Sequence, residues 1–250
     1  MQTNESSDRF ANETQLEKCH SYILRQLQDR KSPGGVRPLP PPGPAITISH
    51  QTGAGAHEIA ERLAELLQPA KQKEGALWTV FDRNLVEQVL EEHHLPKALA
   101  KYMPEDRRSY IKNVVEEFVG LRPPSWAMVP QVAETILHLA DAGHVILVGR
   151  GASFITMEMP NVFHVRLIAS QATRIERLQK LNTLTPDEAK KIIARTDRGR
   201  RRYVKAHFHA SVEDELSYHL IINTDRIPYP EAARIIADAA RICLKNLIAV

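Results

Sequence analysis

A glycine-containing turn near residue 50 holds the residues best suited to chemistry. The stretch 46–59, ITISHQTGAGAHEI, combines a short strand, a turn with Gly53 and Gly55, and the start of a helix. Small residues in such a turn let backbone N–H groups approach an anion, and the N-terminus of a helix adds a favourable dipole. The fragment indicates either a phosphate-binding loop or a tight strand-to-helix turn without a ligand.

The turn departs from the usual phosphate-loop pattern, G-x-x-x-x-G-K-[ST]. Counted back from Gly55, the first glycine position holds His50, the lysine position holds Ala56 and the hydroxyl position holds His57. The lysine normally reaches the β- and γ-phosphates, and the hydroxyl binds magnesium. The sequence therefore keeps the backbone cradle and loses its charge and its metal ligand. The candidate phosphate-binding residues are Thr52, Gly53, Ala54, Gly55, Ala56, His57 and Glu58.

Two further candidates follow predicted strands. Asp82 comes after the apolar run 78–81, where its carboxylate is able to cap the helix that follows; a substrate role for it is implied only by the family resemblance described below. Arg150 lies between two glycines after the apolar run 144–148. Open α/β sheets bind ligands at the carboxyl ends of their strands, and the guanidinium fork suits phosphate. Arg150 is predicted to bind a ligand, with a structural ion pair as the alternative.

A basic cluster occupies the segment from Arg195 to Lys205, which has six basic residues, one acid and a local net charge of +5. Arginines placed near a transferring phosphate stabilise its charge and contribute about 10³–10⁵ in rate. The alternatives are a solvated basic helix face and an RNA-phosphate patch. Upstream, Arg174 and Arg177 are interpreted as a surface face paired with Glu176.

The elements that must position these residues alternate between strands and helices. Apolar runs predict five strands, at 45–49, 78–81, 144–148, 162–168 and 218–222. Helices are predicted after the glycine turn, over 84–142 with proline breaks, over 170–181, from a capping box at 185–188 onward, and over about 230–247. This alternation predicts an α/β domain with a five-stranded, mostly parallel sheet covered on both faces.

Residues 1–44 are predicted to form an appendage to that domain. Helical periodicity over 8–30 precedes a proline-dense linker that ends at Pro44. We expect the helix to dock on the domain or on a partner. The net charge of +3 is too small to indicate nucleic-acid or membrane binding, and two cysteines near opposite ends of the chain favour a reducing cytoplasm.

Four segments in order resemble the cytidylate kinase-like family, a group of divergent relatives of cytidylate kinase and other nucleoside monophosphate kinases. They are ITISHQTGAGAHEIAERLAELL, WTVFDRNLVEQVL, GHVILVGRGASFI and the Asp/Arg-rich stretch before HLIINT. The resemblance covers residues 45 to about 245 and implies a P-loop nucleotide kinase-like three-layer fold. It implies a domain over 45–250, with a helical acceptor-side insertion at 84–142 and an Arg-rich lid at 183–212.

The resemblance also implies a nucleotide kinase. ATP would bind the turn 52–58, with Mg²⁺ held mainly through the nucleotide. A nucleoside monophosphate such as CMP or dCMP would bind near Asp82 and Arg150. Family members commonly carry a small residue followed by Arg at the lysine position, whereas His57 follows here. The lid residues that match the family's spacing, and that are predicted to be catalytic, are Arg195, Asp197, Arg198 and Arg202.

Two other functions remain open from the sequence. One is a nucleotide-sensing module without turnover, which the missing lysine and the N-terminal appendage favour. The other is an RNA-binding protein that uses the basic lid. A small-molecule nucleotide is the expected ligand, a membrane is not expected, nucleic acid is disfavoured, and residues 1–44 are a candidate docking segment for a protein partner.

Overall fold

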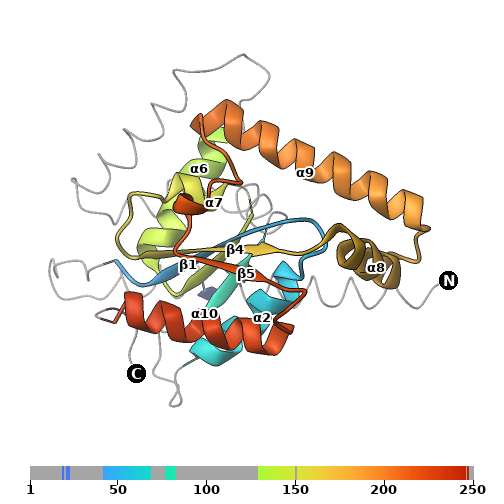
Figure 1. The fold of residues 1–250 in the computed structure, drawn as a ribbon. Helices are drawn as coiled ribbons and strands as arrows, with labels where there is room; N and C mark the ends of the chain where they lie inside the picture. The colour runs from blue at the N-terminus through green and yellow to red at the C-terminus, as the bar shows by residue number, and fades with distance from the viewer. Residues whose placement is uncertain are drawn as a thin grey trace, which may run out of the picture.

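The centre of the molecule is a five-stranded sheet (Figure 1). The computed structural model describes residues 19, 21–22, 42–68, 77–82, 129–149, 151–245 and 247. The strands are β1 (Ala45–His50), β2 (Thr79–Phe81), β3 (Val145–Val148), β4 (Val162–Ile168) and β5 (Leu220–Asn223). Their order is β2-β3-β1-β4-β5, and every neighbouring pair is parallel. The predicted α/β class and its five-stranded parallel sheet are confirmed.

Helices cover both faces of the sheet and complete a three-layer fold (Figure 1). On one face, α2 (Ala56–Leu67) and α10 (Tyr229–Cys243) pack on each other and on the apolar side chains of β1 and β4. On the other face lie α6 (Val129–Ala142) and the short α7 (Ala152–Ile155). Because successive side chains of a strand alternate between faces, each buried strand contributes to both cores.

Two consecutive helices carry most of the lysines and arginines found among the described residues. Helix α8 (Gln171–Asn182) begins at Ser170, whose hydroxyl accepts from the Thr173 amide. Helix α9 (Pro186–Phe208) begins at the predicted capping box, in which Thr185 and Glu188 bond reciprocally. In Figure 1, α9 extends from the end of α8 toward α7. The lid of the sequence analysis is therefore one long, well-capped helix.

Some predicted boundaries differ from the structure. The last strand starts at Leu220, since Tyr218 and His219 connect the 3-10 turn η2 (Glu215–Ser217) to it, and α10 ends at Cys243. Of the predicted helical insertion 84–142, only α6 belongs to the described residues, and Arg150 and most of residues 1–41 lie outside them. Among the described helices, none combines the length and apolar character needed to cross a bilayer.

Two residues of the N-terminal segment are buried against the domain. The Cys19 thiol contacts the Val80 carbonyl at 3.6 Å, and the Tyr22 hydroxyl donates to the Gly143 carbonyl. The Tyr22 ring lies edge-on to Phe81, with ring centroids 5.7 Å apart. These contacts favour the prediction that the segment docks on its own domain.

We expect Tyr22→Phe to lower the free energy of unfolding by about 1–2 kcal/mol, because the buried Gly143 carbonyl loses its donor while the ring packing remains. Urea denaturation of the full chain measures this change. The neighbouring Ser21 is exposed, so Ser21→Ala is the matched control. Equal stability of all three proteins would show that the docking contact does not contribute to folding.

Candidate functional site

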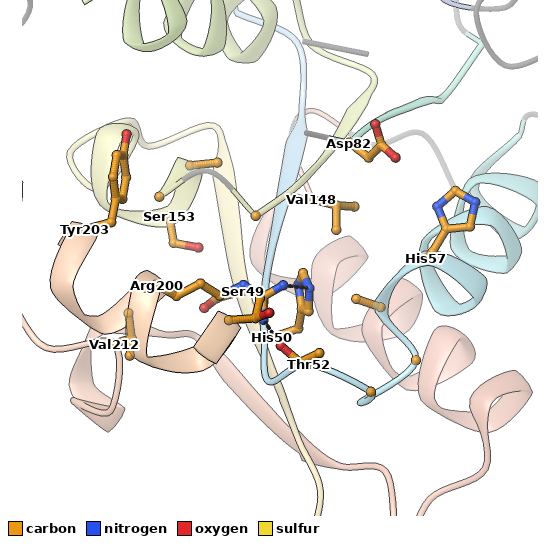
Figure 2. Close-up of a pocket in the computed structure, with 18 of the residues that line it drawn as sticks. Ser49, His50, Thr52, His57, Asp82, Val148, Ser153, Arg200, Tyr203 and Val212 are labelled. Carbon is orange, nitrogen blue, oxygen red and sulfur yellow. Dashed lines mark hydrogen bonds between the residues drawn. The ribbon is translucent and has the colours of Figure 1, made fainter. Parts of the chain in front are cut away.

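The carboxyl ends of the parallel strands share one edge of the sheet, where open α/β sheets bind their ligands. The loops at this edge enclose a cavity of about 1190 Å³ (Figure 2). The β1–α2 turn, the ends of β2 and β3, and helices α8 and α9 line it. Of the sequence-predicted site residues, those that line the cavity are Thr52, Gly53, Gly55, Ala56, His57, Glu58, Asp82 and Arg195.

The other predicted site residues take different positions. Ala54 is fully buried beneath the turn, and Asp197 contacts the turn directly. Arg198 and Arg202 are exposed on α9 and do not line the cavity. Arg150 lies outside the described residues. The structure thus brings Arg195 and Asp197 to the site and gives no contact that supports a catalytic role for Arg198 or Arg202.

Both glycines of the turn are required by backbone conformation and by close packing. Gly53 has φ +83°, and a Cβ there would lie 2.8 Å from Leu178 Cδ1 and 2.9 Å from the Arg174 carbonyl oxygen. Gly55 has φ +81°, and a Cβ there would overlap the Tyr229 ring. Because L side chains rarely adopt positive φ, the turn needs glycine at both positions. Helices α8 and α10 consequently fix the shape of the turn from outside.

The N-terminus of α2 presents hydrogen-bond donors at this cavity. The first helical bond runs from the Ile59 amide to the Gly55 carbonyl (3.0 Å), so the three amides before it have no acceptor within the helix. No side chain caps this end, and Ala56 lines the cavity. Glu58, in the first turn, pairs with Arg62 at 3.3 Å. An anion can therefore bind to backbone amides and to the positive end of the helix dipole.

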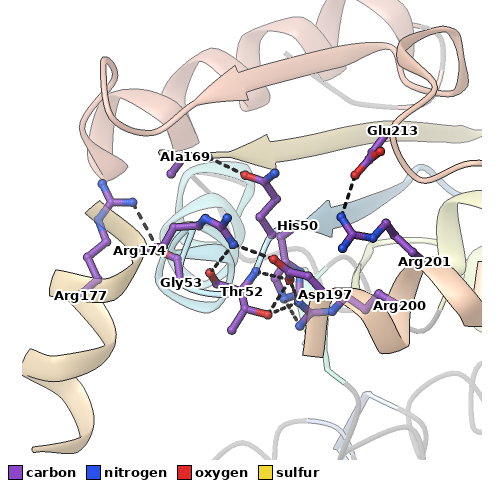
Figure 3. Close-up of polar contacts among 11 residues, drawn as sticks. His50, Thr52, Gly53, Ala169, Arg174, Arg177, Asp197, Arg200, Arg201 and Glu213 are labelled. Carbon is purple, nitrogen blue, oxygen red and sulfur yellow. Dashed lines mark hydrogen bonds and ion pairs between the residues drawn. The ribbon is translucent and has the colours of Figure 1, made fainter. Parts of the chain in front are cut away.

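A network around Asp197 ties α9 to the turn (Figure 3). The Asp197 carboxylate accepts from the Thr52 amide (3.0 Å) and the Thr52 hydroxyl (2.7 Å). Arg174 donates to its other oxygen, Oδ2, at 2.6 Å. Arg200 donates at 3.1 Å to Oδ1, the oxygen that Thr52 also contacts, and at 2.6 Å to the Thr52 hydroxyl. The second Arg200 nitrogen lies 2.9 Å from His50 Nε2. Three elements, β1, α8 and α9, are thereby joined at the first half of the turn.

Asp197 is held in its charged form by these contacts. Burial alone would raise the pKa of Asp197, but the bonds from Thr52 and the nearby Arg174 lower it below its usual range. Its carboxylate accepts the hydrogen bond of the Thr52 amide, as an anionic ligand would. The Gln51 and Ala54 amides donate to the carbonyls of Leu167 and Gln51, so the amides left for such a ligand are those of Gly53, Gly55 and the α2 N-terminus.

His50, in the first glycine position of the loop pattern, is neutral. Burial, together with the positive charge of Arg200, lowers the pKa of His50 from 6.5 to about 3. Because Arg200 is always a donor, His50 Nε2 accepts from it and the ring proton belongs on Nδ1. A neutral imidazole therefore orients the guanidinium of Arg200 toward Thr52.

The low pKa of His50 predicts acid sensitivity. The unfolded chain binds a proton at His50 below about pH 6.5, whereas the folded chain does not until about pH 3, so stability falls as the pH drops between these values. We expect the stability loss from pH 7 to pH 5 to be about 2 kcal/mol smaller in His50→Gln than in the unmodified protein. Urea denaturation at the two pH values measures it. Equal losses in both proteins would contradict the assignment.

Arg177 supports the other side of the turn. It donates to the Thr224 hydroxyl (2.8 Å), to the Thr224 carbonyl (2.7 Å) and to the Gly53 carbonyl (3.4 Å). Its guanidinium carbon lies 4.9 Å from the centroid of the Tyr229 ring. Arg177 also lines the cavity, so it contributes positive charge there as well as structure.

The interpretation of Arg174 and Arg177 as a surface face paired with Glu176 was wrong. Arg174 is buried and forms an ion pair with Asp197, and Glu176 pairs with Lys180 instead. Arg200 was not among the residues predicted to be catalytic, and a helical repeat in α9 was the signal available for it in the sequence. Positions 196, 199, 200 and 203 line the cavity at spacings of three and four, and the same repeat places Arg200 on that face and Arg201 off it.

Comparisons with known proteins agree with this architecture. The model of the cytidylate kinase-like family matches residues 45–226. An uncharacterized protein from Eubacterium ventriosum is 18% identical, with a TM-score of 0.62, and the match covers 80% of this chain and 99% of that one. Shikimate kinase from Bacteroides thetaiotaomicron is 17% identical over 81% of this chain and 98% of its own, with a TM-score of 0.42. Proteins of curated function gave no match.

The family assignment follows from the length of the match and from the fold. At 18% identity, the Eubacterium protein shows a shared fold and nothing of function. The family model, in contrast, spans β1 through the residues that follow β5, including the glycine turn and the whole of α9. The family match covers most of the chain and agrees with the five-stranded parallel sheet, so the chain belongs to the cytidylate kinase-like family.

Proposed function

We propose that this protein transfers a phosphoryl group from ATP to a nucleoside monophosphate, CMP or dCMP, or to a related small acceptor. One observation carries the proposal. The glycine turn and the uncapped N-terminus of α2 open on a cavity of about 1190 Å³ that Arg177, Arg195 and Arg200 also line. Backbone donors and several guanidinium groups around one cavity are what phosphoryl transfer requires, because its catalysis is mostly positioning and charge stabilisation.

In this proposal the ATP phosphates bind the amides of the turn and of α2. Arg200 supplies the positive charge that the lysine position lacks, since Ala56 fills that position and Arg200 reaches the turn from α9. Arg195 and Arg177 add charge from two other sides of the cavity. The acceptor binds toward Asp82, at the end of β2. Arg150, the other residue proposed to bind it, lies outside the described residues.

Magnesium fits this site as an ion carried by the nucleotide. His57 stands at the position of the usual hydroxyl ligand, and the Thr52 hydroxyl is bonded to Asp197 and Arg200. Within the described part of the chain, no group of three or more His, Cys, Asp or Glu side chains could hold a metal by itself. Phosphate oxygens and water are ligands that Mg²⁺ prefers. Glu58 and Asp82 are the carboxylates that line the cavity.

A turnover assay tests the proposal. The full chain is incubated with ATP, Mg²⁺ and each nucleoside monophosphate in turn, and ADP release and phosphorylated product are both measured. We expect product with CMP or dCMP above that with the other acceptors. Product with none of the acceptors, while calorimetry shows that ATP binds, would reject catalysis and leave a nucleotide-binding site.

ATP binding without any product is the behaviour expected of the alternative function, a nucleotide-sensing module without turnover. The bonds from Thr52 to Asp197 favour it, because a carboxylate of the protein itself already occupies one amide of the turn. In such a module, nucleotide binding would displace Asp197 and so change the packing of α9. Calorimetry with ATP, ADP and CMP, combined with the turnover assay, separates the two functions.

A further inference from the structure

Strands β1 and β4 carry an unusual row of polar side chains on one face. Central strands of a parallel sheet are covered on both faces and are therefore expected to be apolar on both. Here Thr47 pairs in register with His164, and Ser49 pairs with Arg166. The Thr47 hydroxyl lies 2.8 Å from His164 Nδ1 and 2.9 Å from the hydroxyl of Ser153 on α7. The row leads along the sheet to Ser49, which lines the cavity.

Arg166 is a buried cation for which the described residues provide no carboxylate partner. Its exposed fraction is 7%, and its single hydrogen bond in the described structure is a donation from Nη1 to the Ser49 hydroxyl, at 2.8 Å. No carboxylate of the described residues forms an ion pair with it, whereas the similarly buried Arg174 has Asp197. Its guanidinium carbon lies 5.5 Å from the centroid of the Tyr218 ring. Burying an unpaired charge is costly, so such a group is normally paired or binds an anion.

The hydroxyl groups of Ser49 and Tyr218 lie beside Arg166, and their hydrogen bonds determine which protons remain to be donated. The Ser49 hydroxyl accepts from Arg166, and the Tyr218 hydroxyl donates to the Val212 carbonyl at 3.0 Å. The hydroxyl proton of Ser49 is therefore left to donate, and its acceptor among the described residues, the Tyr218 hydroxyl oxygen, is 3.3 Å away. This is a long bond for two hydroxyls. Ser49 thus presents a weakly used donor to the cavity, backed by a positive charge.

We propose that Ser49 and Arg166 form an oxyanion subsite at the carboxyl ends of β1 and β4, separate from the amides of the glycine turn. Residues 46 and 48 of β1 face α2, and Ser49 faces the side of the sheet that carries α7, so this subsite and the α2 N-terminus lie toward opposite faces. An anion here is a different group from the one that the turn binds. The subsite takes an oxyanion group, phosphate or carboxylate, of the second substrate.

The first test needs only the full chain and simple anions. Thermal unfolding is followed in chloride buffer while inorganic phosphate or, in a separate arm, acetate is added, for the unmodified protein, Arg166→Met, Ser49→Ala and the control Arg234→Met. Arg234 is exposed on α10, away from the cavity. We expect an oxyanion to stabilise the unmodified protein and the control. In Arg166→Met and Ser49→Ala, the concentration needed for half of the effect should rise about 10-fold or more.

Stability without added anion separates a binding role from a structural one. Replacing an uncompensated buried cation by an apolar side chain of similar length should leave Arg166→Met as stable as the unmodified protein, or more stable, in chloride alone. If Arg166→Met does not fold, Ser49→Ala decides by itself. The proposal would be overturned if neither phosphate nor acetate stabilised the unmodified protein. It would also be overturned if these anions stabilised Arg166→Met and Ser49→Ala at the same concentrations as the unmodified protein.

A second measurement assigns the subsite to the second substrate, and this step rests on the proposed function. We expect Arg166→Met to weaken CMP binding by about 10-fold or more, with ATP binding within about twofold of the unmodified protein. Cytidine, which lacks the phosphate, should bind both proteins alike. If Arg166→Met lost ATP binding instead, the subsite would belong to ATP, the phosphoryl donor, and this assignment would be refuted. Absence of turnover alone would reject the kinase function and leave the oxyanion subsite standing.

Discussion

Arg200→Ala is expected to lower kcat about 10³-fold, the largest effect of any substitution in the lid. Arg200 is the residue of α9 whose guanidinium reaches both the Thr52 hydroxyl and His50, at 2.6 and 2.9 Å. With Ala56 in the lysine position, this guanidinium is the cation nearest to the first half of the turn in the described structure. An arginine that stabilises charge on a transferring phosphate contributes about 10³–10⁵ in rate. Steady-state kinetics with ATP and the best acceptor measure the loss.

The neighbouring arginine is a matched control for this prediction. Arg201 is not among the residues that line the cavity, and it pairs with Glu213 at 3.0 Å. Figure 3 shows its side chain directed toward Glu213 and away from Asp197. Arg201→Ala should therefore keep kcat within about twofold, because exposed ion pairs contribute little. Arg200→Lys should retain part of the activity, since it keeps the charge and loses the fork. Equal kinetics for Arg200→Ala and Arg201→Ala would contradict the role assigned to Arg200.

Asp197→Ala is expected to lower the free energy of unfolding by about 3–5 kcal/mol. The substitution leaves Arg174, whose side chain is 10% exposed, without the carboxylate that accepts from it at 2.6 Å. Breaking a buried pair by removing one partner strands the other charge in a poorly solvated place. The variant also removes the acceptor of the Thr52 amide and hydroxyl. Urea denaturation at pH 7 measures the change.

The pH dependence of this effect has a definite sign. The folded-state pKa of Asp197 is lowered, so its contribution is fully present above its unfolded pKa of about 3.9 and is lost as the pH falls through the lower folded value. The difference between the unmodified protein and Asp197→Ala should therefore shrink only below about pH 4. Glu213→Ala, which breaks the exposed pair with Arg201, should change stability by less than about 0.5 kcal/mol. A similar small effect for Asp197→Ala would refute the proposed buried pair.

Ala56 stands in the lysine position, and the positive charge near the turn comes from helix α9 instead of from the turn itself. In the usual phosphate loop, the cation is covalently part of the turn. Here Arg200 belongs to α9, and it reaches the turn because Asp197, one helical turn earlier, bonds to Thr52 and Arg174. The charge at the turn consequently depends on the docking of α9. A ligand that displaces Asp197 from Thr52 would reposition Arg200 at the same time.

The fold was predictable from local patterns in the sequence. Five apolar runs separated by helical repeats lead to five parallel strands, and the capping box at Thr185 and Glu188 marks the start of α9 where it was predicted. The glycine turn was predictable for the same reason, because positive φ at Gly53 and Gly55 is a property of the turn itself. Each of these features depends on residues that are near one another in the chain.

The partners of the arginines were decided by the tertiary structure alone. Arg198 and Arg202 matched the expected spacing and yet are exposed, whereas Arg174, Arg177 and Arg200 converge on the turn. Thr52 meets Asp197 across 145 positions of the chain, and Ser49 meets Arg166 across 117. A basic residue on a helix has a charge and a periodicity in the sequence, but the group that it faces depends on how the helix packs against the sheet. The sequence by itself thus determined where an anion could bind, and the packing of α8 and α9 decided which cations are there to meet it.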